Sequence, residues 1–215
     1  MPELSRRVQT FTDSVIRRMT RINNMTPGSI NLSQGFPDFD PPQEILDALK
    51  EAAEHGPHQY SITFGAKNFR DALAEMYTKK FAREIDPEKE IVVTCGGTEA
   101  MMAAMMTVCN PRDKVAVFSP FYENYGADAI LSGADPVYVP LVPPDFHYDS
   151  EALERAFQAG AKALILCNPS NPCGKVFTME EMEEIAELAK RYDAFVITDE
   201  VYEYIIYGEN RHISM

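Results

Sequence analysis

The feature that most restricts the fold of this chain is a series of short, uninterrupted apolar runs separated by stretches of helical periodicity. A strand with one face in water alternates apolar and polar side chains, whereas a strand buried on both faces is apolar throughout. The sequence therefore predicts a sheet that is covered on both faces. The runs lie at residues 91–94, 115–118, 137–139, 163–167 and 195–198.

Helix signals fill the intervals between these runs. Thr178 and Glu181, for example, have the spacing of a capping box, which starts a helix. Because strands and helices alternate, we predict a doubly wound α/β fold with a mostly parallel sheet and helices on both faces. Residues 1–40 are interpreted as an N-terminal arm and helix, and residues 41–215 as the large domain. The expected helices span residues 41–55, 67–83, 149–159 and 178–192, with a further one starting near residue 98.

The charge balance restricts the partners of the chain. With 20 basic and 33 acidic residues the formal net charge is -13, which argues against nucleic acid, because phosphate backbones attract Lys and Arg. No apolar run approaches the roughly 20 residues of a membrane-spanning helix. The N-terminus also lacks the apolar core of a secretion signal. We therefore expect a cytoplasmic protein that binds neither nucleic acid nor membrane.

The first segment is rich in arginine, a composition that also occurs in transit peptides. Because the segment is not rich in serine, we favour a solvated first helix whose apolar side chains face a core or a partner. These side chains are Val8, Phe11, Val15, Ile16 and Met19.

The four cysteines predict free thiols and no metal site. None forms a Cys-x-x-Cys pair, and no histidine lies at ligand spacing from them. Cys95 and Cys167 lie in or beside apolar runs, so we expect buried thiols in a reducing compartment.

The residues that follow each run carry the functional signals, since ligands of such sheets bind at the carboxyl ends of the strands. Gly96, Gly97 and Thr98 follow the first run and open a helix, which is the arrangement of a phosphate cradle. Asp199 follows the last run directly, where a carboxylate needs a cationic partner. Taken singly, the glycines are also explained as turn residues and Asp199 as a helix cap.

Three more side chains follow the apolar runs. Tyr122 lies in an aromatic segment and can stack on a planar ligand, although a core position explains it equally well. Asn171 lies in a rigid turn with two Asn-Pro pairs and can donate a hydrogen bond or serve the turn alone. Tyr202 is near enough to Asp199 to face the same site. Together the strand ends describe a flat, phosphorylated ligand with a basic ring nitrogen, which pyridoxal 5'-phosphate fits.

With these motifs, the chain resembles the class I/II, fold type I aminotransferases, and most of all the branch of kynurenine, glutamine and methionine aminotransferases. The order and spacing of the motifs make the resemblance specific, and it covers essentially the whole chain. It implies transamination between an L-amino acid and a 2-oxo acid in amino acid metabolism, a pyridoxal 5'-phosphate cofactor and a homodimer. The motifs are residues 31–39, 59–70, 96–100, 168–174 and 199–202.

The resemblance also implies roles for residues that bind the cofactor. Gly97, Thr98 and Glu99 would hold the phosphate with their backbone N–H groups. Tyr122 would stack on the pyridine ring. Asp199 would pair with the ring nitrogen.

Further roles follow from the same resemblance. Asn171 and Tyr202 would bind the ring hydroxyl oxygen, and with the aspartate they form the expected catalytic set. Gly35, together with Asn171, would lie near the substrate carboxylate. Tyr60 would reach the phosphate of the neighbouring subunit.

The sequence lacks several elements of the family pattern, namely the Schiff-base lysine, the later phosphate ligands, the arginine that binds the substrate carboxylate and the C-terminal small domain. The family carries a Schiff-base lysine a few tens of residues after its Asp-x-x-Tyr motif, and no lysine follows Lys190 here. Lys175 is expected to be solvated and is a poor substitute. By this resemblance we expect a catalytically incomplete fragment of a larger enzyme, with a large domain that is incomplete at its C-terminus. The alternatives are a pyridoxal-phosphate-dependent β-lyase, the aminotransferase-like module of a regulator, and a non-catalytic fragment that only binds a partner.

Overall fold

The computed structural model describes residues 2–10 and 14–215. The chain divides into two compact units, residues 1–11 with 95–215 and residues 12–94, and each is described here by itself. Among the described residues, no helix is both long enough and apolar enough to cross a membrane.

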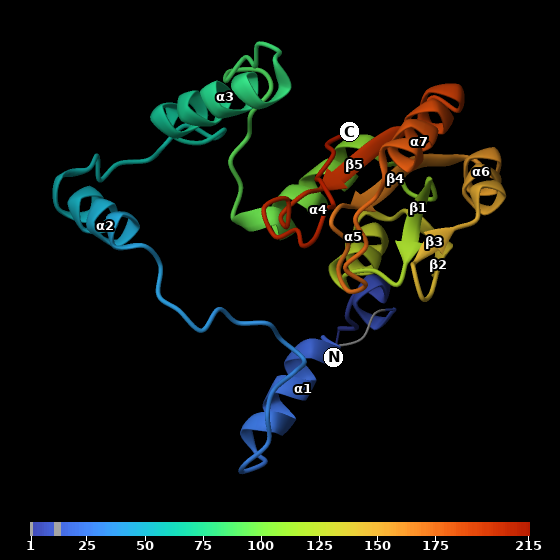
Figure 1. Ribbon diagram of the computed structural model, residues 1–215, viewed down its shortest axis with the longest axis horizontal. Coiled ribbons are helices and arrows are strands. Elements are labelled where there is room, and N and C mark those ends of the chain that lie inside the picture. Colours follow the sequence, from blue (N-terminus) through green and yellow to red (C-terminus); the bar gives the residue numbers. More distant parts are fainter. Residues whose placement is uncertain (1, 11–13) are drawn as a thin grey trace. The chain divides into compact units, whose positions relative to one another are not determined.

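The larger unit contains a five-stranded sheet (Figure 1). Its strand order is β3-β2-β1-β4-β5, in which β1, β2, β4 and β5 are parallel and β3 is antiparallel to β2. β2 and β3 lie on one side of β1, and β4 and β5 lie on the other, so the predicted doubly wound, mostly parallel arrangement is confirmed. The strands are β1 (Lys114–Ser119), β2 (Asp135–Val142), β3 (His147–Tyr148), β4 (Ala161–Cys167) and β5 (Phe195–Asp199).

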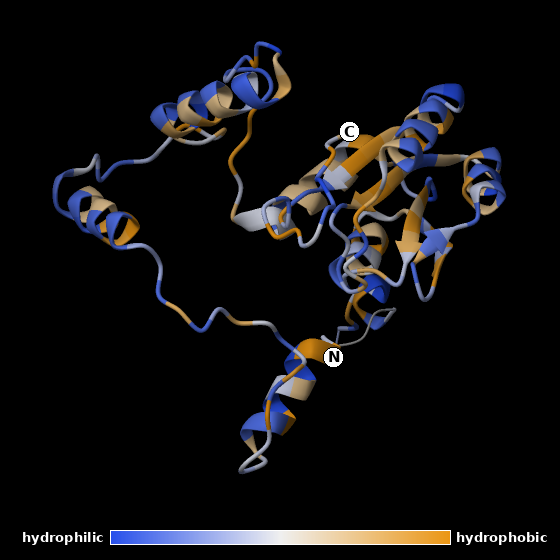
Figure 2. Cartoon of the chain, viewed as in Figure 1, coloured by the Kyte–Doolittle hydropathy of each residue, from blue (hydrophilic) through white to orange (hydrophobic). Residues whose placement is uncertain are grey.

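Helices cover both faces of this sheet. α4 (Gly96–Val108) and α5 (Asn124–Ser132) pack on one face, and α6 (Ser150–Gln158) and α7 (Met179–Arg191) pack on the other. Figure 2 shows apolar, orange central strands and, on α6 and α7, blue polar residues. A short 3-10 helix, η1 (Arg6–Gln9), is tied to this unit by a hydrogen bond from the Arg7 guanidinium to Leu131 O, 3.2 Å long.

The central strand β1 shows why the apolar runs are uninterrupted. Val115 and Val117 belong to the core under α4 and α5, whereas Ala116 and Phe118 belong to the core under α6 and α7. All four are at most 5% exposed. A polar side chain at any of these positions would enter one core or the other, so the strand has no position for one.

One predicted strand is wrong. Residues 91–94 form no strand among the described residues; the backbone N–H of Val93 instead donates to Phe64 O at 3.0 Å. An apolar run becomes a strand only where another strand lies beside it to exchange hydrogen bonds. The structure also adds α5 and β3, which the sequence patterns did not predict, and α4 begins at Gly96, before the expected Thr98.

The capping box that starts α7 is confirmed, and it corrects the prediction for Lys175. The Thr178 hydroxyl accepts from the Glu181 N–H, and the Glu181 carboxylate accepts from the Thr178 N–H. The same carboxylate binds the Lys175 ammonium at 2.7 Å. The lysine side chain is only 8% exposed, and its ammonium lies 4.9 Å from the Phe177 ring centroid. The prediction of a solvated lysine is therefore wrong.

The smaller unit contains three helices, α1 (Val15–Asn24), α2 (Gln43–His55) and α3 (Lys67–Phe81). Its most buried side chain is Arg70, which is completely shielded from solvent and donates to Gly65 O at 3.1 Å and to Pro87 O. These bonds join α3 to the segments on either side of it.

The first helix does not contribute a core, contrary to one reading of its apolar side chains. No residue of η1 or α1 is buried, and Val8 of η1 and Val15 and Met19 of α1 are between 44% and 52% exposed. Phe11 lies outside the described residues. A partner for these side chains stays a prediction.

Buried Asp128 of α5 makes stability depend on pH. It is 4% exposed, its Oδ2 has no hydrogen-bond partner among the described residues, and burial raises its pKa to about 6. Because the folded-state pKa lies above the unfolded value, the buried group opposes folding once it ionises, so stability falls as pH rises from about 4 through 6. Asp128→Asn should be more stable than the wild type by about 1–3 kcal/mol at pH 8 and should lose this advantage at pH 4.

Urea unfolding at pH 4, 6 and 8 measures this effect, with the exposed Asp135→Asn as the matched control. A stability difference between Asp128→Asn and the wild type that does not change with pH would contradict the assignment.

Candidate functional site

The carboxyl ends of β4 and β5 form the frame of the candidate site. Cys167, the last residue of β4, is paired in register with Asp199, the last residue of β5. The N–H of Asn168 donates to the backbone oxygen of Asp199 at 3.0 Å, which continues the pairing by one residue. The polar residues that follow the two strands therefore start from neighbouring positions.

The Asp199 carboxylate is held by two donors. Its Oδ2 accepts from the hydroxyl of Tyr125 at 2.8 Å, and its Oδ1 accepts from the N–H of Val201 at 3.2 Å. Burial raises the pKa of Tyr125, and the nearby Cys167 and Asp199 raise it further. The phenol therefore keeps its proton and acts as a donor.

Asn171 and Tyr202 are brought together next to this carboxylate's strand end. Asn171 lies in the turn after β4, and Tyr202 lies in the turn after β5. The Asn171 amide donates to the Tyr202 hydroxyl at 3.4 Å, and both side chains are half-buried. An amide and a phenol in contact offer a donor pair to one ligand oxygen.

The N-terminus of α4 provides the room and the donors of an anion site. Gly96 has φ +79°, a conformation that favours glycine, and a Cβ atom on Gly96 or Gly97 would meet no atom within 4 Å. The space beside the first turn is therefore open to a ligand. Thr98 Oγ1 accepts from the Asn124 amide at 2.9 Å, while the Glu99 carboxylate accepts from the Cys95 N–H. The first N–H groups of a helix favour an anion such as phosphate.

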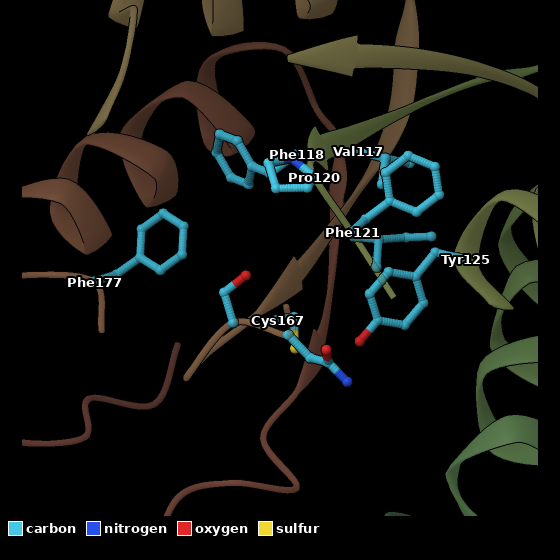
Figure 3. Close-up of a pocket in the computed structure, with 10 residues that line it drawn as sticks. Val117, Phe118, Pro120, Phe121, Tyr125, Cys167 and Phe177 are labelled. Atoms are coloured by element: carbon cyan, nitrogen blue, oxygen red, sulfur yellow. The ribbon is translucent and has the colours of Figure 1, made fainter. Parts of the chain in front are cut away.

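An aromatic pocket lies at the same strand ends (Figure 3). Figure 3 shows Phe177 and Tyr125 on opposite sides of it with Cys167 between them. Asn171 also lines the pocket. Tyr122 is half-buried, and its ring stands edge-on to that of Tyr125, with centroids 5.8 Å apart.

The two remaining predicted site residues lie in the smaller unit. Gly35 is exposed, and Tyr60 is fully exposed. Their predicted contacts with the substrate carboxylate and with a neighbouring subunit's phosphate stay predictions.

Sequence reasoning missed two residues that shape the site, Tyr125 and Asn124. Both lie in the first turn of α5, within the aromatic segment that yielded Tyr122. A helix prediction for 124–132 would have placed both side chains near the strand ends. The expectation of a buried Cys95 is wrong, because it lies exposed at the start of α4, whereas Cys167 is buried as expected.

Within the described parts of the chain, one group of side chains has the spacing of metal ligands, namely Glu200, Glu203 and His212. Both carboxylate oxygens of Glu200 accept from the Ser214 hydroxyl, and its Oε2 lies 3.1 Å from His212 Nε2. These contacts within the protein account for the grouping.

A doubly wound sheet with a glycine-rich helix start, an Asn–Tyr pair and a carboxylate at its strand ends defines the large domain of a fold type I aminotransferase. Residues 27–215 match the family described as aminotransferase class I and II, and the chain belongs to that family. Enzymes of this family use pyridoxal 5'-phosphate.

Similar proteins carry aminotransferase names. Kynurenine–oxoglutarate transaminase 3 of Homo sapiens is 34% identical over 222 residues, which cover 98% of this chain and 49% of that protein. Aromatic-amino-acid aminotransferase 2 of Thermococcus litoralis is 33% identical, over 99% of this chain and 55% of that protein. The chain thus spans about half the length of the curated relatives it matches.

Two solved structures that resemble this chain are also aminotransferases. N-succinyldiaminopimelate aminotransferase of Mycobacterium tuberculosis has a TM-score of 0.91 and 37% identity, covering 98% of this chain and 55% of that one. Aspartate aminotransferase of Thermus thermophilus, solved with maleate, has a TM-score of 0.91 and 32% identity, covering 100% of this chain and 57% of that one.

Proposed function

We propose that the chain is the cofactor-binding part of an enzyme that transfers an amino group between an L-amino acid and a 2-oxo acid, with pyridoxal 5'-phosphate at the carboxyl ends of β4 and β5. The observation that carries this proposal is Asp199, a strand-end carboxylate whose two oxygens are each held by a donor. The open space at Gly96 and Gly97 supports it, because the first turn of α4 has room for a phosphate.

The residues fit the groups of the cofactor one by one. The N–H groups of Gly97, Thr98 and Glu99 would hold its phosphate at the positive end of α4. The Asn171 amide and the Tyr202 hydroxyl would hold the ring hydroxyl oxygen. When bound, the cofactor supplies an electron-withdrawing ring that stabilises the charge left on a substrate Cα when its proton departs.

Asp199 would keep a proton on the ring nitrogen, because a carboxylate in hydrogen-bond contact stabilises the positively charged form. Tyr122 would cover the ring and exclude water from it. Gly35 and Asn171 would leave room and a donor for the substrate carboxylate.

The setting of this site is part of the proposal. Two copies would pair, with Tyr60 reaching the phosphate of the neighbouring subunit, and the enzyme would act in the cytoplasm. Each copy would consist of an N-terminal arm, residues 1–40, and a large domain, residues 41–215.

Binding of pyridoxamine 5'-phosphate to the purified chain tests the cofactor site. This amine form is chosen because it cannot react with surface lysines as an aldehyde does. Titration calorimetry should show one site per chain that prefers this ligand to pyridoxamine and to inorganic phosphate by at least roughly tenfold each, since ring and phosphate contacts both contribute. An affinity no greater than that of inorganic phosphate would refute the proposal.

A product assay on a protein of the relatives' full length tests the reaction. Transfer predicts that an L-amino acid and 2-oxoglutarate exchange an amino group. Release of pyruvate and ammonia from a β-substituted amino acid would identify the lyase instead.

A further inference from the structure

The hydroxyl of Tyr125 makes a contact to which the proposed function assigns no role. It lies on α5, on the face of the sheet covered by α4 and α5, and reaches across to Asp199 from a position 74 residues earlier in the chain. We propose that Tyr125 is a positioning residue that orients the Asp199 carboxylate toward the ring nitrogen of the cofactor. This inference rests on the proposed function.

The Tyr125 ring has little freedom to move. Its side chain is in the core with Met101, Val117 and Ile165, and the residue is 3% exposed. The ring also packs edge-on against Tyr122. Close packing of this kind holds a side chain in one rotamer, so the hydroxyl is a fixed point in the site.

In the contact between Tyr125 and Asp199, the phenol is always the donor. The Tyr125 hydroxyl donates to Asp199 Oδ2, and burial raises the pKa of the phenol, so it does not become an acceptor by losing its proton. The thiol of nearby Cys167 donates to Pro169 O at 3.3 Å. The phenol therefore serves the carboxylate as a permanent donor.

Two fixed donors determine the rotation of the Asp199 carboxyl group. Tyr125 holds Oδ2, and the Val201 N–H holds Oδ1. A carboxylate accepts about four hydrogen bonds, so each oxygen keeps capacity for a ligand donor. Without the phenol, Oδ2 loses its protein donor and the group can turn about the Cβ–Cγ bond.

The test uses two ligands that differ at one ring atom. Pyridoxamine 5'-phosphate carries the ring nitrogen, and its 1-deaza analogue carries a C–H group there. Tyr125→Phe should weaken binding of the nitrogen ligand by roughly tenfold, because a hydrogen bond to a charged group is lost. Binding of the deaza analogue should change less than about threefold, since it makes no charged contact with Asp199.

The matched control is Tyr148→Phe. Tyr148 is also buried and donates to a carboxylate, that of Glu184 at 2.7 Å, but it lies in the core under α6 and α7. It should leave both affinities unchanged. Thermal melting of both variants reports any loss of fold.

If the Tyr125→Phe chain does not fold, a double variant provides the test instead. Tyr125→Phe combined with Asp199→Asn removes the donor and the charge together. This destabilises the fold less than removing the donor alone, which leaves a buried charge without its partner. Its affinity for pyridoxamine 5'-phosphate should equal that of Asp199→Asn alone within about twofold, because Tyr125 acts through the charge.

Each result decides between the possibilities. Equal weakening of both ligands by Tyr125→Phe, or no weakening of either, would overturn the positioning role while leaving the cofactor site intact. A double variant that binds much more weakly than Asp199→Asn would do the same. A wild-type chain that does not prefer the nitrogen ligand would overturn the proposed function itself, and the positioning role with it.

Discussion

Asp199→Asn is expected to weaken the binding of pyridoxamine 5'-phosphate by roughly 10- to 100-fold. The amide has nearly the shape of the carboxylate but no charge, so it cannot pair with a protonated ring nitrogen. A hydrogen bond between charged partners is worth about 1.5–3 kcal/mol, and about 1.4 kcal/mol corresponds to a factor of ten. The amide also has one oxygen to accept the Tyr125 O–H and the Val201 N–H, which both bind the carboxylate.

Titration calorimetry at low and moderate salt measures this loss. Asp113→Asn is the control, because Asp113 immediately precedes β1, at the edge of the sheet opposite the strand carboxyl ends. If both variants bind pyridoxamine 5'-phosphate equally well, Asp199 does not contact the ring nitrogen.

Arg70→Met is expected to destabilise the smaller unit by about 2–5 kcal/mol. The side chain is fully buried, and its guanidinium donates to Gly65 O, to Pro87 O and to the Glu88 carboxylate. Methionine fills part of the space but leaves these carbonyl oxygens without a donor, which costs about 1–3 kcal/mol for each buried group. The loss would also loosen the segment that carries Tyr60.

Urea unfolding followed by hydrogen exchange measures this change. Amides near Gly65 and Pro87 should exchange faster, whereas those of β1 and β4 in the other unit should not. The control is Arg83→Met, whose exposed guanidinium pairs with Glu90 at 2.7 Å; exposed ion pairs contribute little to stability. A loss of stability no larger than that of the control would contradict the structural role of Arg70.

The central strands of the sheet could be predicted because β1 and β4 are buried on both faces. The runs 115–118 and 163–167 lie inside β1 and β4, since every side chain in them meets one of two cores. The run 91–94 carries the same local signal but forms no strand. Pairing depends on residues elsewhere in the chain, and a local pattern does not report them.

The site divides in a similar way. Asp199, Asn171 and Tyr202 could be proposed because each follows a predicted strand directly. The contacts that Tyr125 and Asn124 make, across 74 and 26 residues, depend on how α5 packs and have no local signature. The buried Lys175–Glu181 pair was missed for the same reason. The lysine is buried through its contacts with Glu181 and the Phe177 ring, which the local sequence pattern does not report.

The core-facing residues of the strands and the polar residues at the strand ends are separate sets, and this affects how the sequence can evolve. The bodies of β1 and β4 face a core on each side, so mutation there is confined to apolar residues of similar volume. The turns that follow them carry the polar groups, and some of their positions, such as Pro120 and Pro172, are exposed and belong to neither core. Substitutions at such exposed positions can alter ligand preference at small energetic cost, which allows new specificities to evolve on an unchanged scaffold.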